Sequence, residues 1–193
     1  MKKLWTDLHS NIHHNQMDEL DKWTEHAKDV LDFWPIAYYP FQMIKTESGA
    51  GLEDLCPEEE IKKDWEIVRR KVKEENENGY PMFMGYEWQG CGFDGDHNVF
   101  FLDNEQDMKH PMRYQELRDD YKDTEAIGIP HHVAYQLGSR GKNWATHDEN
   151  FSPFAEIYSS HGCSENDTGG MDMERHLHMG PRTGETCYER GLE

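Results

Sequence analysis

Seven of the twelve histidines lie in four short stretches, each of which adjoins an apolar run of strand length. The stretches are Asp7–His14, Asp96–Asn98, Pro130–His132 and Ser160–Gly162. A chain in which such runs alternate with helical segments favours an α/β fold with a mostly parallel, buried sheet. A fifth stretch, Gly85–Trp88, adds a carboxylate in a similar position. Imidazole and carboxylate groups from separate strands are the ligands with which proteins bind zinc, manganese or iron.

The predicted elements follow the order β-α-β-α-β-β-α-β-β. The clearest is a helix that Pro57 opens and Gly79 closes, with a buried stripe through Trp65, Val68 and Val72 at helical spacing. The segment Gln42–Leu55 is predicted to be a loop. We expect further helices at Met17–Phe33, Tyr114–Asp123 and Arg182–Leu192, and strands at Lys3–His9, Ile36–Tyr39, Pro81–Glu87, Asn98–Leu102, Ala126–Pro130 and Phe154–Ser159.

Length and composition narrow the class of protein. With 193 residues, the chain is predicted to form a single domain over residues 1–193. A formal net charge of −19 disfavours a nucleic-acid partner, because phosphates need a basic surface. No apolar run is long enough for a membrane span or a signal core, so a cytoplasmic location is expected. The four cysteines form no C-x-x-C pair, which argues against a disulfide framework or a thiolate zinc site.

The candidate metal ligands lie where strands are predicted to end, the place where α/β barrels carry their functional residues. His9 and Glu87 end two predicted strands, His131 and His132 follow a third, and His161 follows a fourth. His97 begins its strand instead. Taken singly, a histidine after a strand is more often a hydrogen-bonded loop residue, so the joint pattern supports the metal hypothesis. We expect the other histidines to be surface or loop residues; these are His26, His110, His147, His176 and His178. Of these, His176 and His178 form a His-x-His pair, which can chelate a metal.

Five motifs in this order resemble the polymerase and histidinol phosphatase (PHP) superfamily. They are Asp7-Leu8-His9, Gly85-Tyr86-Glu87-Trp88, Asp96-His97-Asn98-Val99, Ile129-Pro130-His131-His132 and Glu156-Ile157-Tyr158-Ser159 with His161-Gly162. The resemblance implies a distorted or incomplete (β/α)7 TIM-like barrel with two or three divalent metal ions. It also implies that Glu87 bridges metals, and that His9 and either His131 or His132 bind them. His97 and His161 match further positions with histidine.

The chain departs from the family pattern in places that affect the site. Asn11 replaces the second histidine of the family's opening His-x-His, so His13 or His14 would supply that imidazole. No Asp-x-His motif follows His161. The expectation is therefore either a C-terminally incomplete domain or a shortened form, with fewer metals or with a site that a partner chain completes. Since an unfinished barrel would expose a sheet edge, we also expect a homo-oligomer.

The leading functional hypothesis is hydrolysis of a phosphoester in a small anionic substrate by metal-activated water. Arg140 and Lys142, in a glycine-rich loop, are predicted to contact the substrate anion, and Glu87 and Arg140 are the predicted catalytic residues. The same chemistry would serve a metal-dependent esterase, amidase or lactonase. A non-catalytic metal-binding module is the alternative from another class. The sequence leaves the metal open among zinc, manganese and iron.

Overall fold

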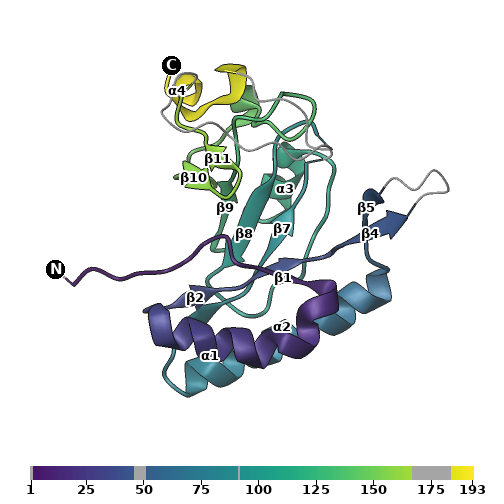
Figure 1. Cartoon of the computed structure of the whole chain (residues 1–193), viewed down its shortest axis with the longest axis vertical. Coiled ribbons are helices and arrows are strands. Elements are labelled where there is room, and N and C mark those ends of the chain that lie inside the picture. The colour runs from purple at the N-terminus through teal and green to yellow at the C-terminus, as the bar shows by residue number, and fades with distance from the viewer. Residues whose placement is uncertain (1, 46–50, 91, 167–183) are drawn as a thin grey trace. The chain divides into compact units, whose positions relative to one another are not determined.

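The computed structural model describes residues 2–45, 51–90, 92–166 and 184–193 (Figure 1). The chain forms two compact units. Unit 1 comprises Met1–Glu87 and Phe100–Met108, and unit 2 comprises Trp88–Val99 and Lys109–Glu193. The single domain expected from the chain length remains a prediction. No helix among the described residues is both long and apolar enough to cross a membrane.

The sheet of unit 1 is built from parallel strands. Strand β1 (Asn11–His13) pairs with β3 (Ala37–Tyr39), and β3 pairs with β7 (Gly85–Trp88), whose last residue belongs to unit 2. The register places Ile12 opposite Tyr38, and Tyr38 opposite Tyr86. All three side chains are fully buried. One apolar row across the strands therefore fixes the register, because a slip by one residue would turn each of these side chains to the other face.

The predicted first strand, Lys3–His9, is wrong. The structure places no strand there, and β1 begins only at Asn11. The reason is burial: Leu4 is 57% and Trp5 is 70% exposed, whereas Ile12 is fully buried. His9 therefore precedes the first strand and does not end it.

The long helix α2 (Glu58–Glu77) confirms the clearest prediction from the sequence. Trp65, Val68 and Val72 form its buried stripe, with at most 3% of each residue exposed. Beyond the helix, Gly79 has a φ of +88°, a left-handed conformation that glycine adopts at little cost.

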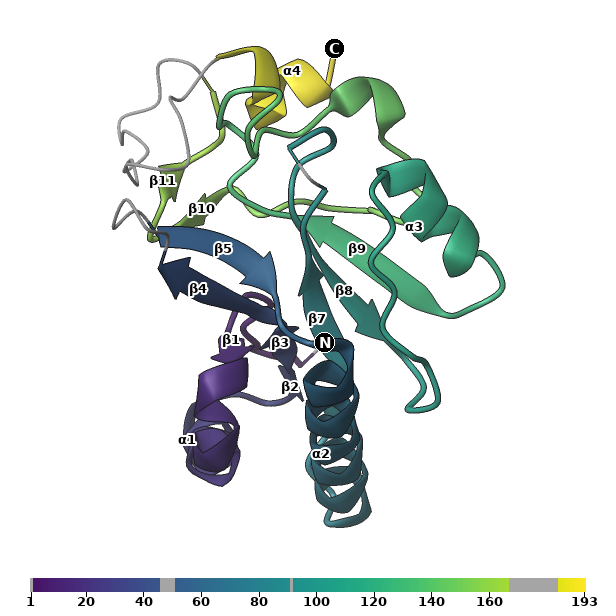
Figure 2. The ribbon, with the colours of Figure 1, turned by 90° about the vertical axis from the view of Figure 1, so that its right-hand side faces the viewer.

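Helix α1 (Leu20–Val30) follows a 3₁₀ helix, η1 (His14–Glu19), so the predicted helix at Met17–Phe33 is confirmed with different ends. Helices α1 and α2 lie side by side in unit 1 (Figure 2). An ion pair of 2.6 Å between Lys71 Nζ and Asp21 Oδ1 links them.

Two further strand pairs complete unit 1. Strand β2 (Trp34–Pro35) runs parallel to β6 (Met82–Phe83), and β4 (Phe41–Lys45) runs antiparallel to β5 (Gly51–Leu55). The predicted loop at Gln42–Leu55 is therefore wrong. The two strands form five cross-strand pairs, from Phe41 with Leu55 to Lys45 with Gly51.

Unit 2 contains the start of β8 (His97–Phe101), all of β9 (Ala126–Pro130) and helix α3 (Tyr114–Asp120). These elements agree with the predictions to within a few residues. The predicted strand at Phe154–Ser159 is shorter in the structure, and the part of the last predicted helix before residue 184 lies outside the described residues. The remaining short elements are η2 (Trp144–Thr146), β10 (Tyr158–Ser159), β11 (Gly162–Cys163), η3 (Gly184–Thr186) and α4 (Tyr188–Gly191).

The predicted (β/α)7 barrel, distorted or incomplete, is wrong. Within the described ranges β1 pairs with β3 alone, and β9 likewise ends its strand order, so both strands are open edges. The described residues contain four α-helices, whereas seven would surround such a barrel. A closed barrel needs every strand to pair on both sides with a consistent tilt, and β1 and β3, with three residues each, give little length for that. The fold is a mixed α/β fold with an open sheet.

Candidate metal centre

Asp96, His131 and His132 form a buried cluster in unit 2. One ligand atom from each residue, a carboxylate oxygen or a ring nitrogen, lies within 4.8 Å of the other two. The three residues are 2%, 1% and 3% exposed. Two imidazoles and one carboxylate are a donor set found in protein zinc and iron sites.

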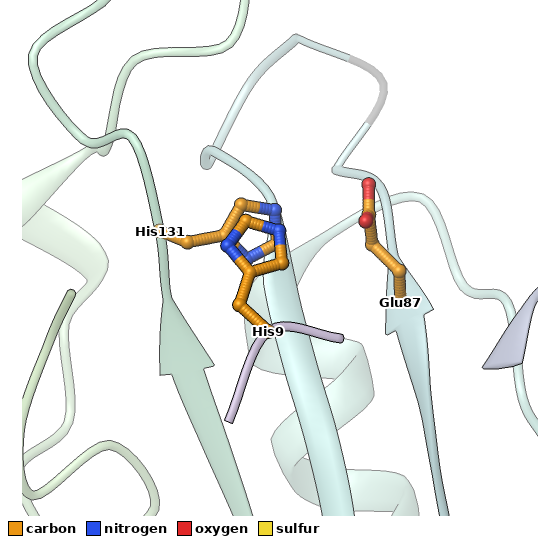
Figure 3. A group of neighbouring side chains, drawn as sticks. All are labelled: His9, Glu87 and His131. Carbon is orange, nitrogen blue, oxygen red and sulfur yellow. The ribbon is translucent and has the colours of Figure 1, made fainter. Parts of the chain in front are cut away.

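The ends of two strands place this cluster. Asp96 directly precedes β8, and His131 directly follows β9, as Figure 3 shows for His131. The His131 backbone N–H donates to the Asp96 carbonyl oxygen at 3.2 Å, which holds the end of β9 next to the start of β8.

His132 has an unusual backbone conformation that brings a second imidazole into the cluster. Its φ is +36°, in the left-handed region that non-glycine residues rarely adopt. Its N–H donates to Glu156 Oε1 at 3.2 Å, and its ring lies 4.4 Å from the ring of His131 at an interplanar angle of 84°. In a continuous strand the two neighbouring side chains would point to opposite faces. The turn after β9 removes that constraint, so both histidines belong to the cluster.

Arg140 balances the charge of the buried carboxylate. Its Nη1 lies 2.6 Å from Asp96 Oδ2, and the same oxygen lies 3.8 Å from His132 Nε2. The Arg140 side chain is 16% exposed, so the guanidinium reaches from the surface to the cluster. A carboxylate has about four acceptor positions, so the ion pair with Arg140 is compatible with binding of an ion by Asp96.

His161 lies at the partly exposed side of the cluster. Its ring centroid is 4.7 Å from that of His132, and its Nδ1 lies 2.9 Å from the hydroxyl of Tyr135. A hydrogen bond to one ring nitrogen fixes the orientation of the ring, which is the usual arrangement around metal-binding histidines.

The residues fit a divalent ion with a small adjustment. Two ligand atoms that are each about 2.1 Å from an ion lie at most about 4.2 Å apart, and the atoms of the cluster lie within 4.8 Å. Shifts of a few tenths of an ångström in the side chains would therefore bring the three atoms into range.

His97 is buried in a different environment from its neighbour Asp96. Its Nδ1 lies 3.1 Å from the carbonyl oxygen of Gly95, to which it donates, and its Nε2 accepts from Lys142 Nζ at 3.1 Å. Burial lowers the pKa of the His97 imidazole well below its usual value, and the Lys142 cation lowers it further. With both ring nitrogens engaged, His97 is a neutral packing residue rather than part of the ligand cluster.

Lys142 is 1% exposed, although the sequence suggests a loop residue facing the substrate. Its Nζ lies 4.0 Å from the centre of the Tyr114 ring. Burial lowers the pKa of Lys142 to about 7, and the negative charge of Asp94 opposes that shift. Lys142 therefore lies in the interior of unit 2.

Asp94, in the same loop as Asp96, is a fully buried structural carboxylate. It accepts from Arg113 Nε at 2.9 Å, from the Tyr114 N–H at 3.0 Å and from Thr146 Oγ1 at 3.0 Å. Burial alone would raise the pKa of Asp94, but these hydrogen bonds outweigh it and lower the pKa below its usual value. Asp94 therefore ties α3 and η2 to the loop that carries Asp96.

The other predicted ligands belong to unit 1. Glu87 lies on β7 (Figure 3), and its Oε2 accepts from Asn11 Nδ2 at 2.7 Å. The N–H of His9 donates to Asp7 Oδ1 at 2.8 Å. That His9 and Glu87 share a metal site with the histidines of unit 2 remains a prediction.

His13 and His14, also in unit 1, have different surroundings. The His13 ring lies 4.5 Å from the ring of Tyr39. His14 Nδ1 lies 2.6 Å from Asp64 Oδ2, and its Nε2 lies 3.1 Å from Glu60 Oε2. Each ring nitrogen of His14 thus already contacts a carboxylate. His176 and His178 lie outside the described residues.

Asp96 is a candidate ligand that the sequence pattern did not suggest, although its motif was recognised for His97. The signal was the alternation of side chains along an extended chain: if His97 faces one side, Asp96 faces the other. Histidine was favoured over aspartate by residue type, and the structure brings the aspartate to the cluster.

Comparisons with known proteins identify no relative: no protein-family model, no curated protein and no solved structure matches this chain. The likeness to the PHP superfamily therefore remains a resemblance between motifs.

Proposed function

We propose that this chain is a metal-dependent hydrolase whose divalent ion is held by Asp96, His131 and His132. The observation that carries the proposal is the convergence of three ligand atoms within 4.8 Å in the interior of unit 2. The geometry supports an ion, and the resemblance of the motifs supports hydrolysis as its use. Zinc, manganese and iron all suit this donor set, and a second ion remains a prediction.

The residues around the cluster have separate tasks in the proposed reaction. When bound, a divalent ion supplies Lewis acidity, which lowers the pKa of water and withdraws charge from a substrate oxygen. Arg140 would bind the anionic group of the substrate, because its planar guanidinium matches phosphate oxygens and is partly exposed. His161, held by Tyr135, would exchange a proton at its other ring nitrogen. We leave Lys142 out of the substrate site because it is buried.

A phosphoester is the substrate class that we favour. The ion and Arg140 together would place two positive groups near the anion, which suits a phosphoryl group better than a neutral ester or lactone. The substrate is proposed to be a small molecule, and a cytoplasmic location and a homo-oligomer remain predictions.

One observation favours a second candidate, a non-catalytic metal-binding module. The three ligands are almost completely buried, and Arg140 already neutralises Asp96. Such a site would hold an ion that stabilises unit 2 without turning over a substrate.

Metal binding is tested first, with the full chain stripped of metal and titrated with Zn²⁺, Mn²⁺ or Fe²⁺ against a chromophoric chelator. The variant His132→Asn removes the imidazole, while asparagine tolerates the left-handed backbone at this position. We expect it to weaken metal binding on the order of 100-fold. The matched variant His26→Asn, at an exposed position on α1, should bind as the wild type does. Equal binding by all three proteins would refute the proposed ligand set.

Turnover separates the two candidate functions. With metal bound, the proposed hydrolase should cleave p-nitrophenyl phosphate faster than p-nitrophenyl acetate, and Arg140→Met should slow phosphate cleavage without weakening metal binding. The reverse preference would indicate an esterase. Tight metal binding with no turnover of either compound would support the non-catalytic module.

A further inference from the structure

Unit 1 contains a cavity of about 350 Å³ next to the β4–β5 hairpin. Its lining residues come from the end of β1, the start of η1, the end of β3 and the hairpin. All of its lining residues lie within the described part of unit 1, and none belongs to the proposed metal centre. The volume lies within the range of small-molecule sites.

Aromatic rings form one wall of this cavity. The ring centroid of Tyr39 lies 4.5 Å from that of His13 and 5.3 Å from that of Phe41, so the three rings form a continuous row. Met43, which is 60% exposed, adds a polarizable side chain at the edge. This wall would accept the apolar body of a ligand.

The charged groups around the cavity are carboxylates. Glu53 lines it and accepts a hydrogen bond from the Tyr39 hydroxyl, which holds the carboxylate next to the ring. The imidazole of His14 also lines the cavity, and each of its nitrogens faces a carboxylate, from Asp64 or Glu60. Among the described residues that line the cavity there is no lysine or arginine. These residues would therefore meet an anionic ligand with carboxylates and with no lysine or arginine to balance them.

We propose that this cavity binds a small organic cation, a substituted ammonium group carried on a compact apolar body. Tyr39 and Phe41 line the cavity, aromatic rings attract ammonium groups through their faces, and Glu53 supplies the opposite charge. A carboxylate has about four acceptor positions, so its bond from the Tyr39 hydroxyl is compatible with contact to such a ligand. The site is an addition to the proposed hydrolase and does not depend on the metal.

The experiment uses the full chain in the presence of a chelator, so that the result is independent of the metal centre. Binding of choline is measured by isothermal titration calorimetry and compared with binding of 3,3-dimethyl-1-butanol, in which carbon replaces the charged nitrogen. We expect choline to bind and the neutral analogue to bind roughly tenfold more weakly or not at all.

Variants locate the site within unit 1. Glu53→Gln removes the charge and keeps the shape, and Phe41→Leu removes a ring; each should weaken choline binding roughly three- to tenfold. Glu59→Gln is the matched control, because Glu59 is an exposed carboxylate on α2 outside the cavity, and its binding should stay within about twofold of the wild type. Circular dichroism confirms that each variant is folded.

Three results would overturn the proposal: no choline binding to the wild type, equal binding of the neutral analogue, or an equal loss in Glu53→Gln and Glu59→Gln. None of them bears on metal binding by unit 2, which is measured separately with metal and the His132→Asn variant.

Discussion

His14 in unit 1 and His97 in unit 2 both have both ring nitrogens engaged, but their partners differ. His14 lies between two carboxylates, with Asp64 at 2.6 Å, and its side chain is 28% exposed. His97 is fully buried and lies 3.1 Å from the Nζ of Lys142. The sequence offers both as candidate metal ligands, yet one lies against two carboxylates and the other against the amino group of a lysine.

The surroundings of these two histidines therefore accommodate charged groups in different ways. In unit 1, Asp64 Oδ2 lies 2.6 Å from His14 Nδ1 and also accepts from the Tyr38 hydroxyl at 2.8 Å. In unit 2, burial lowers the pKa values of His97 and Lys142, so that loss of the proton reduces the charge. The free energy of unfolding should therefore depend on pH through Lys142 in unit 2. In unit 1 it should depend on the contacts of Asp64 with His14 and Tyr38.

The largest effect that we expect is a dependence of stability on pH caused by Lys142. Its pKa is about 7 in the folded chain, against 10.5 as the reference value. Between these two pH values the unfolded chain binds one proton more than the folded chain, so the free energy of unfolding rises with pH across this window. The difference of about 3.5 pH units corresponds to at most about 5 kcal/mol at 1.36 kcal/mol per unit.

Urea denaturation at several pH values between 7 and 10.5 measures this rise. In Lys142→Met the slope of the free energy of unfolding against pH should be smaller by the contribution of one proton. Lys63→Met, a variant of an exposed lysine, should keep the slope of the wild type. The same slope in Lys142→Met and the wild type would show that the lysine stays charged in the folded chain.

The backbone packs more tightly next to Lys142 in unit 2 than at the end of α2 in unit 1. A Cβ added at Gly141, the residue before Lys142, would lie 1.9 Å from the Tyr135 carbonyl oxygen. Gly141→Ala should therefore destabilise the chain by about 3 kcal/mol or more, because backbone has to move. In unit 1, Gly79 has a φ of +88° and nothing within 4 Å, so Gly79→Ala should cost only about 1 kcal/mol of conformational strain. Equal losses in denaturation experiments would mean that the loop before Lys142 is free to adjust.

Removal of the central carboxylate of unit 1 should have a smaller effect. Asp64→Asn keeps the shape of the side chain but removes the carboxylate charge next to His14, and it weakens the hydrogen bond from Tyr38. We expect a loss of about 2 kcal/mol in the free energy of unfolding, because hydrogen bonds to charged groups are the stronger ones. Metal binding should not change, since Asp64 is no part of the proposed ligand set. A large loss of metal affinity in this variant would mean that Asp64 does affect the proposed metal centre.

The sequence predicted the elements whose signal is local. The stripe Trp65, Val68 and Val72 defined α2, and the apolar run Ala126–Pro130 defined β9. It failed where burial depends on distant partners: Leu4 and Trp5 suggested a strand, but the structure leaves them exposed. Periodicity carries no information about which apolar residues find a partner in the fold.

For the candidate site, the motifs placed His131 and His132 correctly after a strand, yet could not assign their neighbours. Whether an imidazole binds an ion depends on what already contacts its nitrogens, and Lys142 reaches His97 from 45 positions along the chain. The left-handed conformation of His132 was equally hidden, because nothing in Pro130-His131-His132 requires it. Such contacts between distant residues can be seen only in the folded chain.

The smallest effect should come from removal of the Tyr38 hydroxyl. This change tests whether the Asp64 carboxylate is held mainly by His14. Tyr38→Phe removes one hydrogen bond, of 2.8 Å, to Asp64 and leaves the ring in the core. Burial raises the pKa of the Tyr38 hydroxyl, and its bond to Asp64 raises it further, so it stays protonated and donates throughout the accessible pH range. We expect a loss of about 1 kcal/mol in urea denaturation, with the pH dependence of the wild type unchanged. A loss as large as that of Asp64→Asn would mean that the bond from Tyr38, and not the contact with His14, accounts for the stabilisation that Asp64 provides.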